Sequence, residues 1–451
     1  MSDDAPLHIV VASRAVAPQH GFGGLERAVT HHLRALARRG VRLSVFTQPP
    51  YPDQPPPDTF TGMVTWHTVL YRRRQLPLRP NSIPDRLIHY APFARTLGTA
   101  IVALCHQERV DIVHAHGLVG LGYAEKYGPP GPPILGGEGS LTKQRPSRSL
   151  PALLTPRPPQ NWGAGGAASP LPPLVLNPHG LEEFSRRDRA KWLAYAPFRY
   201  GVRRVARAAA RVIATDRALI APIGRQLAVP KERIALIPNG VDTGELDALV
   251  DQAVIRELAA RYGLGDSPLT LVSVARLERN KGIQEGIAAL ALLRDRLPNG
   301  WRWLIVGQGS EEATLRTAIG QTGFAANITL VGALPDAEVH SLLSRADLAL
   351  VPSLYEGSSL AALEALTHRL PVVATTAGGL PDKILPGQTG FLAAPADPAA
   401  FAAALAEALV ARANWPTLGA AGRALVERQF SWDALADDYL TLYRQLIARP
   451  R

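Results

Sequence analysis

Short, β-rich apolar runs alternate with stretches of helical periodicity throughout the second half of this 451-residue chain. A strand that is followed by a helix and another strand builds a parallel βαβ unit. The apolar runs lie at 269–274, 303–306, 328–331, 348–351 and 372–375, and the helical stretches at 283–297, 311–320, 336–345, 359–369 and 398–411. The pattern predicts an open, doubly wound parallel sheet.

The first half repeats this alternation more loosely. We expect strands at 8–12, 41–47, 110–114, 133–136, 211–215 and 233–237, and helices at 24–39 and 98–109. The periodicity breaks between Ile237 and Asp242, where Pro, Asn-Gly and Asp follow one another. The sequence therefore predicts an α/β fold of two Rossmann-like domains, residues 1–236 and 237–429, followed by a C-terminal helix over 430–451.

Residues 128–173 fit neither sheet. They hold 12 prolines among Gly, Ser and Arg, and proline cannot donate a ladder hydrogen bond. We predict a long loop or insertion in the first domain. Loops of this length serve as lids or binding loops, or are disordered insertions.

Charge is divided unevenly along the chain. Residues 1–240 carry 31 Lys and Arg against 15 Asp and Glu, whereas residues 241–451 carry 18 against 23. A basic first half indicates contact with something anionic, or else an arginine-rich composition. In 186–211, basic residues are interleaved with four aromatic ones, which resembles an element at a membrane interface; a packed helix pair with a solvated Arg face gives the same pattern. Nucleic acid is disfavoured because no binding motif accompanies the charge.

The cysteine content and the N-terminal residues indicate where in the cell the protein is expected. Cys105 is the only cysteine, which excludes a disulfide scaffold and a cysteine-based metal site. The acidic start Met1–Asp4 is unlike a secretory signal, and no continuous apolar run approaches the ~20 residues of a membrane span. We expect a cytoplasmic protein, at most peripheral on the inner face of a membrane.

Two strand-to-helix loops of the first half stand out. Gly23-Gly24 opens the helix expected at 24–39, and paired glycines let a phosphate or sugar approach free backbone N–H groups; a tight turn is the alternative. The loop lacks the G-x-G-x-x-G pattern of a dinucleotide site. His114 and His116 share one side of a strand, and His116 lies nearer its carboxyl end, as a substrate contact or a structural histidine. Two histidines without a third ligand make a poor metal site.

Cations follow the first strand of the second half. Arg276 and Lys281 lie between the strand 269–274 and the next helix, where two cations can clamp a diphosphate. Ordinary solvated charge is the alternative. However, cations near a helix N-terminus oppose the helix dipole, so their presence favours a bound anion.

A pair of carboxylates follows the strand 348–351. Glu356 lies in the turn, Gly357-Ser358-Ser359-Leu360 opens a helix, and Glu364 lies roughly 8 Å further along its axis. The first helical turn has no acidic side chain, so its N–H groups are free for ligand oxygens. Two carboxylates beside such a pocket suit the vicinal hydroxyls of a sugar and a ribose. Gly307, after the strand 303–306, belongs to the same edge of the sheet.

These residues together resemble the retaining nucleotide-sugar glycosyltransferases of the GT-B fold, glycosyltransferase family 4 (glycosyl transferases group 1). The resemblance covers nearly the whole chain and is strongest over 231–430. The segments that carry it are Glu356…Glu364, Arg276…Lys281-Gly282, Ile237–Asp242, Gly23-Gly24-x-Glu26, His114-Ala115-His116, Asn177-Pro178-His179-Gly180 and Phe430-Ser431-Trp432. The family's fold implies that helix 430–451 packs back on the first domain.

The resemblance also implies roles for the C-terminal residues. Arg276 and Lys281 stabilise the departing diphosphate. Glu364 holds the ribose hydroxyls, while Glu356 and the backbone of Gly357–Leu360 hold the sugar. The family commonly has an aromatic residue and a glycine where this chain has Ser358-Ser359, which leaves the sugar open.

In the first domain, His116 is implied to contact the transferred sugar near the reacting carbon, and Gly23-Gly24 to approach the phosphates or the acceptor. Family members transfer with retention, by front-face attack in which a donor phosphate oxygen takes the acceptor proton, and without a metal. The chain contains no D-x-D triplet, which agrees with this.

We therefore expect a hexosyltransferase with no cofactor or metal. It moves a sugar from a UDP- or GDP-sugar to a hydroxyl acceptor such as a glycan, a lipid-linked saccharide or a small metabolite. One alternative is a sugar-nucleotide epimerase of similar two-domain build. Another is a non-catalytic sugar-nucleotide-binding subunit, which the intact set of Arg276, Lys281, Glu356 and Glu364 argues against.

Overall fold

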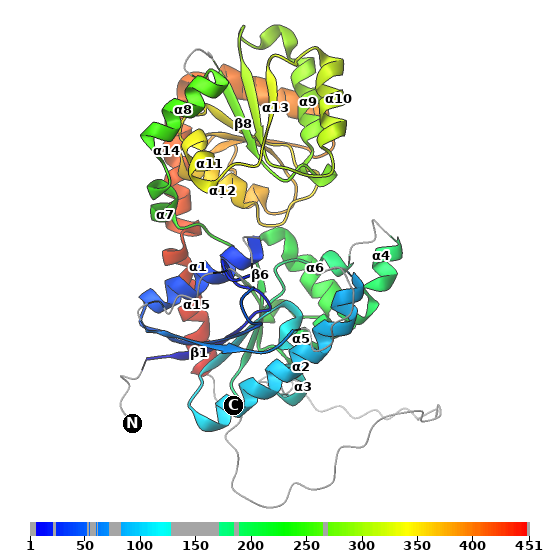
Figure 1. Cartoon of the computed structure of the whole chain (residues 1–451), viewed down its shortest axis with the longest axis vertical. Coiled ribbons are helices and arrows are strands. Elements are labelled where there is room, and N and C mark those ends of the chain that lie inside the picture. The colour runs from blue at the N-terminus through cyan, green and yellow to red at the C-terminus, as the bar shows by residue number, and fades with distance from the viewer. Residues whose placement is uncertain are drawn as a thin grey trace, which may run out of the picture.

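The chain folds into two α/β domains, stacked along the long axis of the molecule (Figure 1). The computed structural model describes residues 6–20, 24–51, 54, 60, 62–71, 83–127, 171–184, 189–264 and 269–448. Each domain is a parallel sheet covered by helices, which confirms the prediction of two Rossmann-like domains in a GT-B fold.

The N-terminal sheet has seven parallel strands in the order β3-β2-β1-β4-β5-β6-β7. Their bounds are β1 His8–Ala12, β2 Arg42–Thr47, β3 Val64–Thr68, β4 Ile112–His116, β5 Leu174–Asn177, β6 Arg211–Ala214 and β7 Ile234–Leu236. The order reverses between β1 and β4, which pair in register from Ile9 with Ile112 to Ala12 with Ala115. This reversal leaves a crevice at the carboxyl ends of the two strands.

The C-terminal sheet has six parallel strands in the order β10-β9-β8-β11-β12-β13. Their bounds are β8 Thr270–Val274, β9 Arg302–Val306, β10 Ile328–Gly332, β11 Leu348–Val351, β12 Val372–Thr375 and β13 Gly390–Ala393. Here the order reverses between β8 and β11, which pair through Leu271 with Leu348 and Val272 with Ala349.

Helices cover both faces of each sheet (Figure 1). In the N-terminal domain they are α1 Gly24–Arg38, α2 Ile83–Gln107, α3 Leu121–Tyr127, α4 Arg189–Ala194, α5 Ala196–Ala208 and α6 Arg217–Leu227. The remainder are α7 Thr243–Ala248, α8 Gln252–Tyr262, α9 Ile283–Leu292, α10 Glu312–Thr322, α11 Asp336–Leu343, α12 Leu360–Thr367, α13 Pro398–Val410, α14 Trp415–Leu425 and α15 Trp432–Ile447.

Several sequence-based boundaries were incomplete. The strands β3, β5 and β13 were missed. β3 is a half-exposed edge strand, β5 follows directly on the Pro-rich segment, and β13 begins with a glycine. The helix expected at 98–109 is the second half of the longer α2, which continues through Pro92. The strand expected at 133–136 and residues 128–170 of the Pro-rich segment lie outside the described residues.

The chain crosses between the domains twice, near Val241 and again near Phe430, and these two segments contact each other. The Val241 N–H donates to the Phe430 carbonyl at 2.9 Å, and Trp432 N–H donates to the Val241 carbonyl at 3.2 Å. A side chain at Gly240 would place its Cβ 2.4 Å from the Phe430 carbonyl oxygen, so this approach requires glycine. Beyond this point α15 runs back along α1 on the N-terminal sheet (Figure 1).

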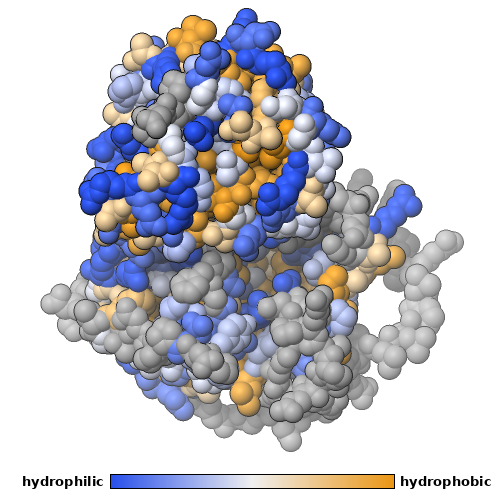
Figure 2. All heavy atoms as spheres, turned by 45° about the horizontal axis from the view of Figure 1, so that its top comes forward, coloured by the Kyte–Doolittle hydropathy of each residue, from blue (hydrophilic) through white to orange (hydrophobic). Residues whose placement is uncertain are grey.

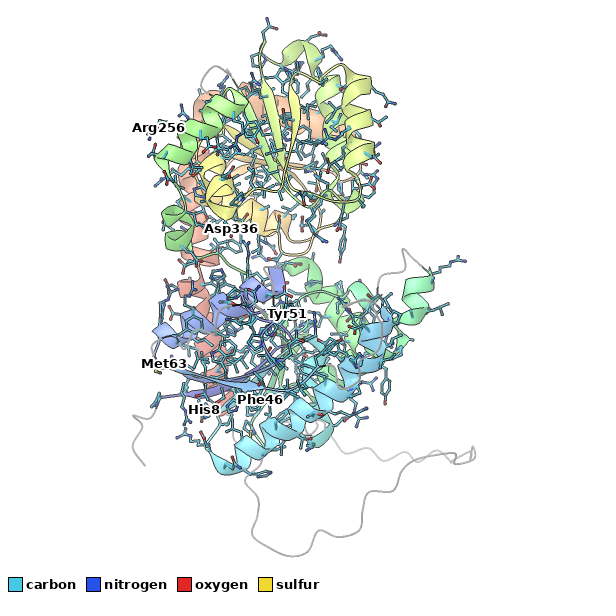
Figure 3. The ribbon with its side chains drawn as sticks, viewed as in Figure 1. His8, Phe46, Tyr51, Met63, Arg256 and Asp336 are labelled. Carbon is cyan, nitrogen blue, oxygen red and sulfur yellow. The ribbon has the colours of Figure 1, made fainter. Side chains whose placement is uncertain are left out.

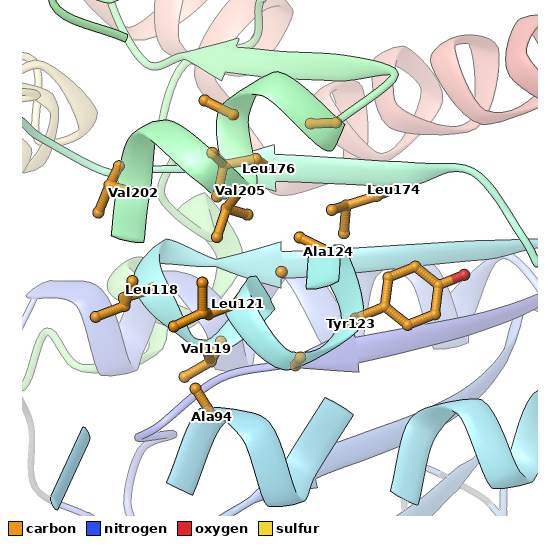
Figure 4. Close-up of a cluster of buried hydrophobic side chains, with 14 of the residues drawn as sticks. Ala94, Leu118, Val119, Leu121, Tyr123, Ala124, Leu174, Leu176, Val202 and Val205 are labelled. Atoms are coloured by element: carbon orange, nitrogen blue, oxygen red, sulfur yellow. The ribbon is translucent and has the colours of Figure 1, made fainter. Parts of the chain in front are cut away.

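The other face of the N-terminal sheet is closed by α2, α3 and α5. Figure 4 shows Ala94 of α2, Leu121 of α3 and Val205 of α5 in one cluster of buried side chains, which also includes Leu174 and Leu176 of β5. Among the described helices, α2 alone is long and apolar enough, by length and composition, to cross a membrane. Its residues Phe93, Leu97 and Ile101 are buried in this core, which accounts for its apolar character.

Candidate functional site

The predicted site residues follow strands on either side of the C-terminal reversal. Arg276 and Lys281 lie after β8, and Glu356 lies after β11, its neighbour in the sheet. The backbone joins the two loops directly, because the N–H groups of Leu354 and Tyr355 donate to the Asn280 carbonyl at 2.8 and 3.2 Å. Ligands of open α/β sheets bind at such reversals.

Lys281 and Glu356 form an ion pair that joins these two loops. Lys281 Nζ lies 2.9 Å from Glu356 Oε1 and 2.8 Å from Oε2, and Ser353 Oγ donates to Oε2 at 3.0 Å. The Lys281 side chain is 18 % exposed and that of Glu356 is 10 % exposed. The pair is therefore charge-balanced and partly withdrawn from solvent.

Arg276 is arranged differently from Lys281. Its guanidinium lies 2.6 Å from Glu278 Oε1, and its side chain is 70 % exposed. Both cations thus lie at one edge of the sheet, but Arg276 pairs with Glu278 and Lys281 pairs with Glu356. An exposed arginine can leave such a partner at little cost, because exposed ion pairs contribute about 0 to 1 kcal/mol.

Three glycines allow the loops to approach one another. Gly282 has φ +66°, and a Cβ there would lie 1.9 Å from the Pro352 carbonyl oxygen. A Cβ at Gly307 would lie 1.8 Å from the Ala275 oxygen, and one at Gly378 would lie 1.8 Å from the Glu356 oxygen. These positions admit only glycine, and they hold the backbone on both sides of Lys281 and Glu356.

The segment Gly357–Leu360 leads into α12 as the sequence indicates. Ser359 is the N-cap, and its Oγ accepts from the Ala362 N–H at 3.4 Å. Gly357 has open space where a Cβ would be. Ser358 Oγ is buried and has no hydrogen-bond partner within the described part of the chain. The turn therefore presents backbone N–H groups and one unsatisfied hydroxyl at the positive end of a helix.

Glu364 lies within α12, and its environment is unusual for a carboxylate. Burial raises its pKa to about 7, an effect that the nearby Arg27 guanidinium partly offsets and the Asp336 carboxylate reinforces. Arg27 belongs to α1 of the other domain and lies 3.1 Å from Asp336 Oδ2. Figure 3 places Asp336 at the junction of the two domains. Glu364 thus has a poorly solvated carboxyl group beside the interdomain crevice.

The two crevices face each other across the junction. A Cβ at Gly24, the first residue of α1, would lie 3.9 Å from Leu360 Cδ1, the first residue of α12. The N-termini of the two helices therefore meet. Gly23, its predicted partner, lies outside the described residues.

His116 ends β4, as predicted, and lies at the reversal of the N-terminal sheet. Its Nδ1 is 2.6 Å from Nε2 of His179, in the loop after β5. The His179 N–H donates to Asn177 Oδ1 at 2.9 Å, which fixes this loop. Burial lowers the pKa of both imidazoles, to about 3 for His179 and well below the ordinary value for His116. Both rings are therefore neutral at pH 7.

A pocket of about 360 Å³ opens beside His116 in the N-terminal domain. Polar groups of Arg86, Glu183 and Tyr195 share its lining with His179. The sequence alone assigns no individual role to His179 or Ser353. His179 is part of the Asn177–Gly180 segment, and Ser353 lies three residues before Glu356. Their closeness to these motifs is the only feature of the sequence that could have indicated a role for them.

Two family models match the chain. One, described as Glycosyl transferases group 1, matches residues 254–417, and the other, Glycosyltransferase Family 4, matches residues 22–138 and 157–245. Together they span most of both domains, including the loops of the site described above. The chain belongs to this family of GT-B glycosyltransferases.

Relatives of this glycosyltransferase act on several substrates. The D-inositol 3-phosphate glycosyltransferase of Segniliparus rotundus is 28 % identical over 94 % of this chain and 84 % of its own length. The GDP-mannose-dependent alpha-(1-6)-phosphatidylinositol monomannoside mannosyltransferase of Mycobacterium tuberculosis is 33 % identical, over 46 % of this chain and 54 % of that protein. Sucrose-phosphate synthase from Thermosynechococcus elongatus has the same fold, with a TM-score of 0.68, 21 % identity, and 98 % and 99 % coverage of the two chains.

Proposed function

We propose that this glycosyltransferase transfers a hexose from a UDP- or GDP-sugar to a hydroxyl acceptor, with retention and without a metal. The observation that carries the proposal is the Lys281–Glu356 pair, held by three hydrogen bonds at the reversal of the C-terminal sheet. Its position beside the N-terminus of α12 suits a diphosphate and a sugar. One relative is named as GDP-mannose-dependent, which supports a nucleotide-sugar donor.

Each residue has a chemical task in this proposal. Lys281 and Arg276 neutralise the charge that develops on the diphosphate as the glycosidic bond breaks, so that no metal is needed. Glu356 and the backbone of Gly357–Leu360 bind the sugar hydroxyls, and Glu364 accepts from the ribose hydroxyls. Because the buried imidazole of His116 is neutral, it serves as a hydrogen-bonding group to the sugar rather than as a charged acid.

Retention is proposed through front-face attack. The acceptor oxygen forms the new bond to the anomeric carbon on the side from which the diphosphate leaves, and its proton passes to a phosphate oxygen of the leaving group. The enzyme then needs no covalent nucleophile and acts through positioning and charge. The pocket beside His116 is the proposed acceptor site, for a glycan, a lipid-linked saccharide or a small metabolite.

Calorimetry tests the donor assignment. We expect one of UDP, GDP and ADP to bind tightly in EDTA, and Glu364→Ala to weaken that binding at least tenfold. The variant Glu407→Ala, at an exposed position of α13, is the matched control and should bind as the wild type does. If the folded protein bound none of the three nucleotides, the transferase proposal would be overturned.

We also propose a cytoplasmic enzyme that binds an anionic membrane surface through α4 and α5. Arg204 and Arg207 are exposed on α5, and Leu193 and Tyr200 nearby are 66 % and 67 % exposed. On the face of the C-terminal domain that Figure 2 shows, hydrophilic and hydrophobic residues are interspersed. Basic groups beside exposed apolar ones suit an acidic lipid headgroup layer.

Vesicle sedimentation tests this surface. The protein should sediment with vesicles that contain phosphatidylglycerol and not with neutral ones, and high salt should release it. The double variant Arg204→Glu, Arg207→Glu should remain in the supernatant, whereas Arg294→Glu, Arg316→Glu on the other domain should not. Equal sedimentation of both double variants would refute this surface.

A further inference from the structure

The N-terminal sheet buries a third histidine against the two that the sequence places on one strand. His32 lies on α1, and His114 and His116 lie on β4. The three side chains are 1 %, 0 % and 4 % exposed. One ring nitrogen of each lies within 4.8 Å of a ring nitrogen of each of the others. The fold thus places a third buried histidine beside the His-x-His pair.

In each of the three imidazoles, one ring nitrogen has a hydrogen-bond partner and the other has none among the described residues. His114 Nδ1 lies 2.7 Å from Tyr443 Oη, and His116 Nδ1 lies 2.6 Å from His179 Nε2. His32 Nε2 lies 3.4 Å from the same Tyr443 hydroxyl, which belongs to α15. The remaining nitrogens, His32 Nδ1, His114 Nε2 and His116 Nε2, are buried and have no partner among the described residues.

This division is the arrangement of a metal-binding histidine, in which one nitrogen binds the ion and the other is oriented by a hydrogen bond. Three buried ring nitrogens without partners are otherwise costly, at about 1 to 3 kcal/mol each. A single ion that bound all three would remove the whole of this penalty.

We propose that His32, His114 and His116 bind one divalent transition-metal ion, of the zinc class. Neutral imidazoles suit Zn²⁺ and Co²⁺, whereas Mg²⁺ and Ca²⁺ prefer oxygen ligands. Tyr443 and His179 orient the ligands from behind. A tetrahedral ion held by three histidines keeps a fourth position for water or another donor. The sugar-transfer chemistry proposed above does not use this ion, and its binding is a separate property.

Occupancy would have a consequence at the neighbouring pocket. The ion would take the free nitrogen of His116, whose ring lines that pocket beside His179. His116 would then no longer be free to donate to or accept from a sugar. A metal at this position would therefore inhibit rather than support a transfer that uses His116.

The test is Co²⁺ and Zn²⁺ binding to full-length protein without an affinity tag, stripped with EDTA and then freed of it. We expect one ion per chain at micromolar affinity or better, with the intense visible absorption of four-coordinate Co²⁺. His32→Leu should lower the affinity at least 100-fold. His340→Leu is the matched control, because His340 lies in another buried pair, 2.9 Å from His368, and should leave binding unchanged.

A second variant covers the case in which His32→Leu does not fold. Tyr443→Phe keeps all three ligands and removes only the orienting hydroxyl, so it should weaken binding by about 10- to 100-fold. Absence of the four-coordinate Co²⁺ spectrum in the wild type would overturn the proposal. So would equal affinity in the wild type and whichever of these variants folds, or several weak sites that His340→Leu removes. None of these outcomes depends on nucleotide binding or transfer.

Discussion

Replacing Lys281 with alanine should lower the kcat of sugar transfer by about 10²- to 10³-fold, the usual cost of removing one preorganised group that stabilises charge in the transition state. Lys281 is the only cation among the described residues that contacts Glu356, at 2.8 and 2.9 Å from its two oxygens. The variant also leaves a carboxylate that is 10 % exposed without its counter-ion. Glu356 is then expected to turn away or to bind a proton, which weakens its hold on the sugar.

The matched control for this variant is Arg279→Ala. Arg279 lies in the same loop, but its guanidinium pairs with Glu285 and is 54 % exposed, away from Glu356. Steady-state kinetics should show near-wild-type kcat for Arg279→Ala, and circular dichroism should show both variants folded. If a folded Lys281→Ala enzyme turned over at the wild-type rate, Lys281 would have no role in stabilising the leaving group.

The sequence predicted the fold well because buried parallel strands leave a strong local signal. The strands β8, β9, β10, β11 and β12 all lie where apolar runs alternate with helical periodicity. By contrast, β5 has four residues, Leu174–Asn177, and follows directly on a proline-rich segment. Its place in the middle of the sheet comes from pairing with β4 and β6, and the local sequence does not specify which strands it pairs with.

The candidate site could be predicted in part, because its residues lie in loops that directly follow the predicted strands. Loops that follow parallel strands lie at one edge of the sheet, so Lys281 and Glu356 could be expected at the same cleft, whereas the direct pairing of β8 with β11 is seen only in the structure. The sequence could not tell that Arg276 pairs with Glu278 or that His32 of α1 lies beside His114. Those contacts depend on side-chain direction and on how α1 and α15 pack on the sheet, which are set by tertiary packing.

The raised pKa of Glu364 gives the second large effect, a stability that depends on pH. The folded-state pKa is about 7 and the ordinary value is 4.5, so the folded protein holds a proton that the unfolded chain releases between these values. The contribution of Glu364 to the free energy of unfolding is therefore largest below pH 4.5. It decreases as the pH rises from 4.5 through 7, and it no longer changes above that range. Glu364→Gln, which cannot ionise, should be the more stable protein at pH 8 by about 1 to 3 kcal/mol.

Urea unfolding at pH 5 and pH 8 measures this difference. The advantage of Glu364→Gln over the wild type should grow from pH 5 to pH 8, whereas Glu407→Gln, at an exposed position of α13, should track the wild type at both. A constant difference between wild type and Glu364→Gln across this range would show that Glu364 titrates as an ordinary carboxyl group.

Nucleotide binding should also depend on protonation of Glu364, but affinity should increase with pH where the stability decreases. The ionised carboxylate accepts hydrogen bonds from both ribose hydroxyls, whereas the protonated form keeps one oxygen as a donor. Affinity for the nucleotide should therefore rise between pH 6 and pH 8, and binding at pH 6.5 should release a proton, seen as a calorimetric enthalpy that varies with the ionisation heat of the buffer. Glu364→Gln should bind more weakly and release fewer protons, since only the terminal phosphate of the nucleotide then titrates in this range. If its affinity rose with pH as steeply as that of the wild type, another group would be the one that titrates.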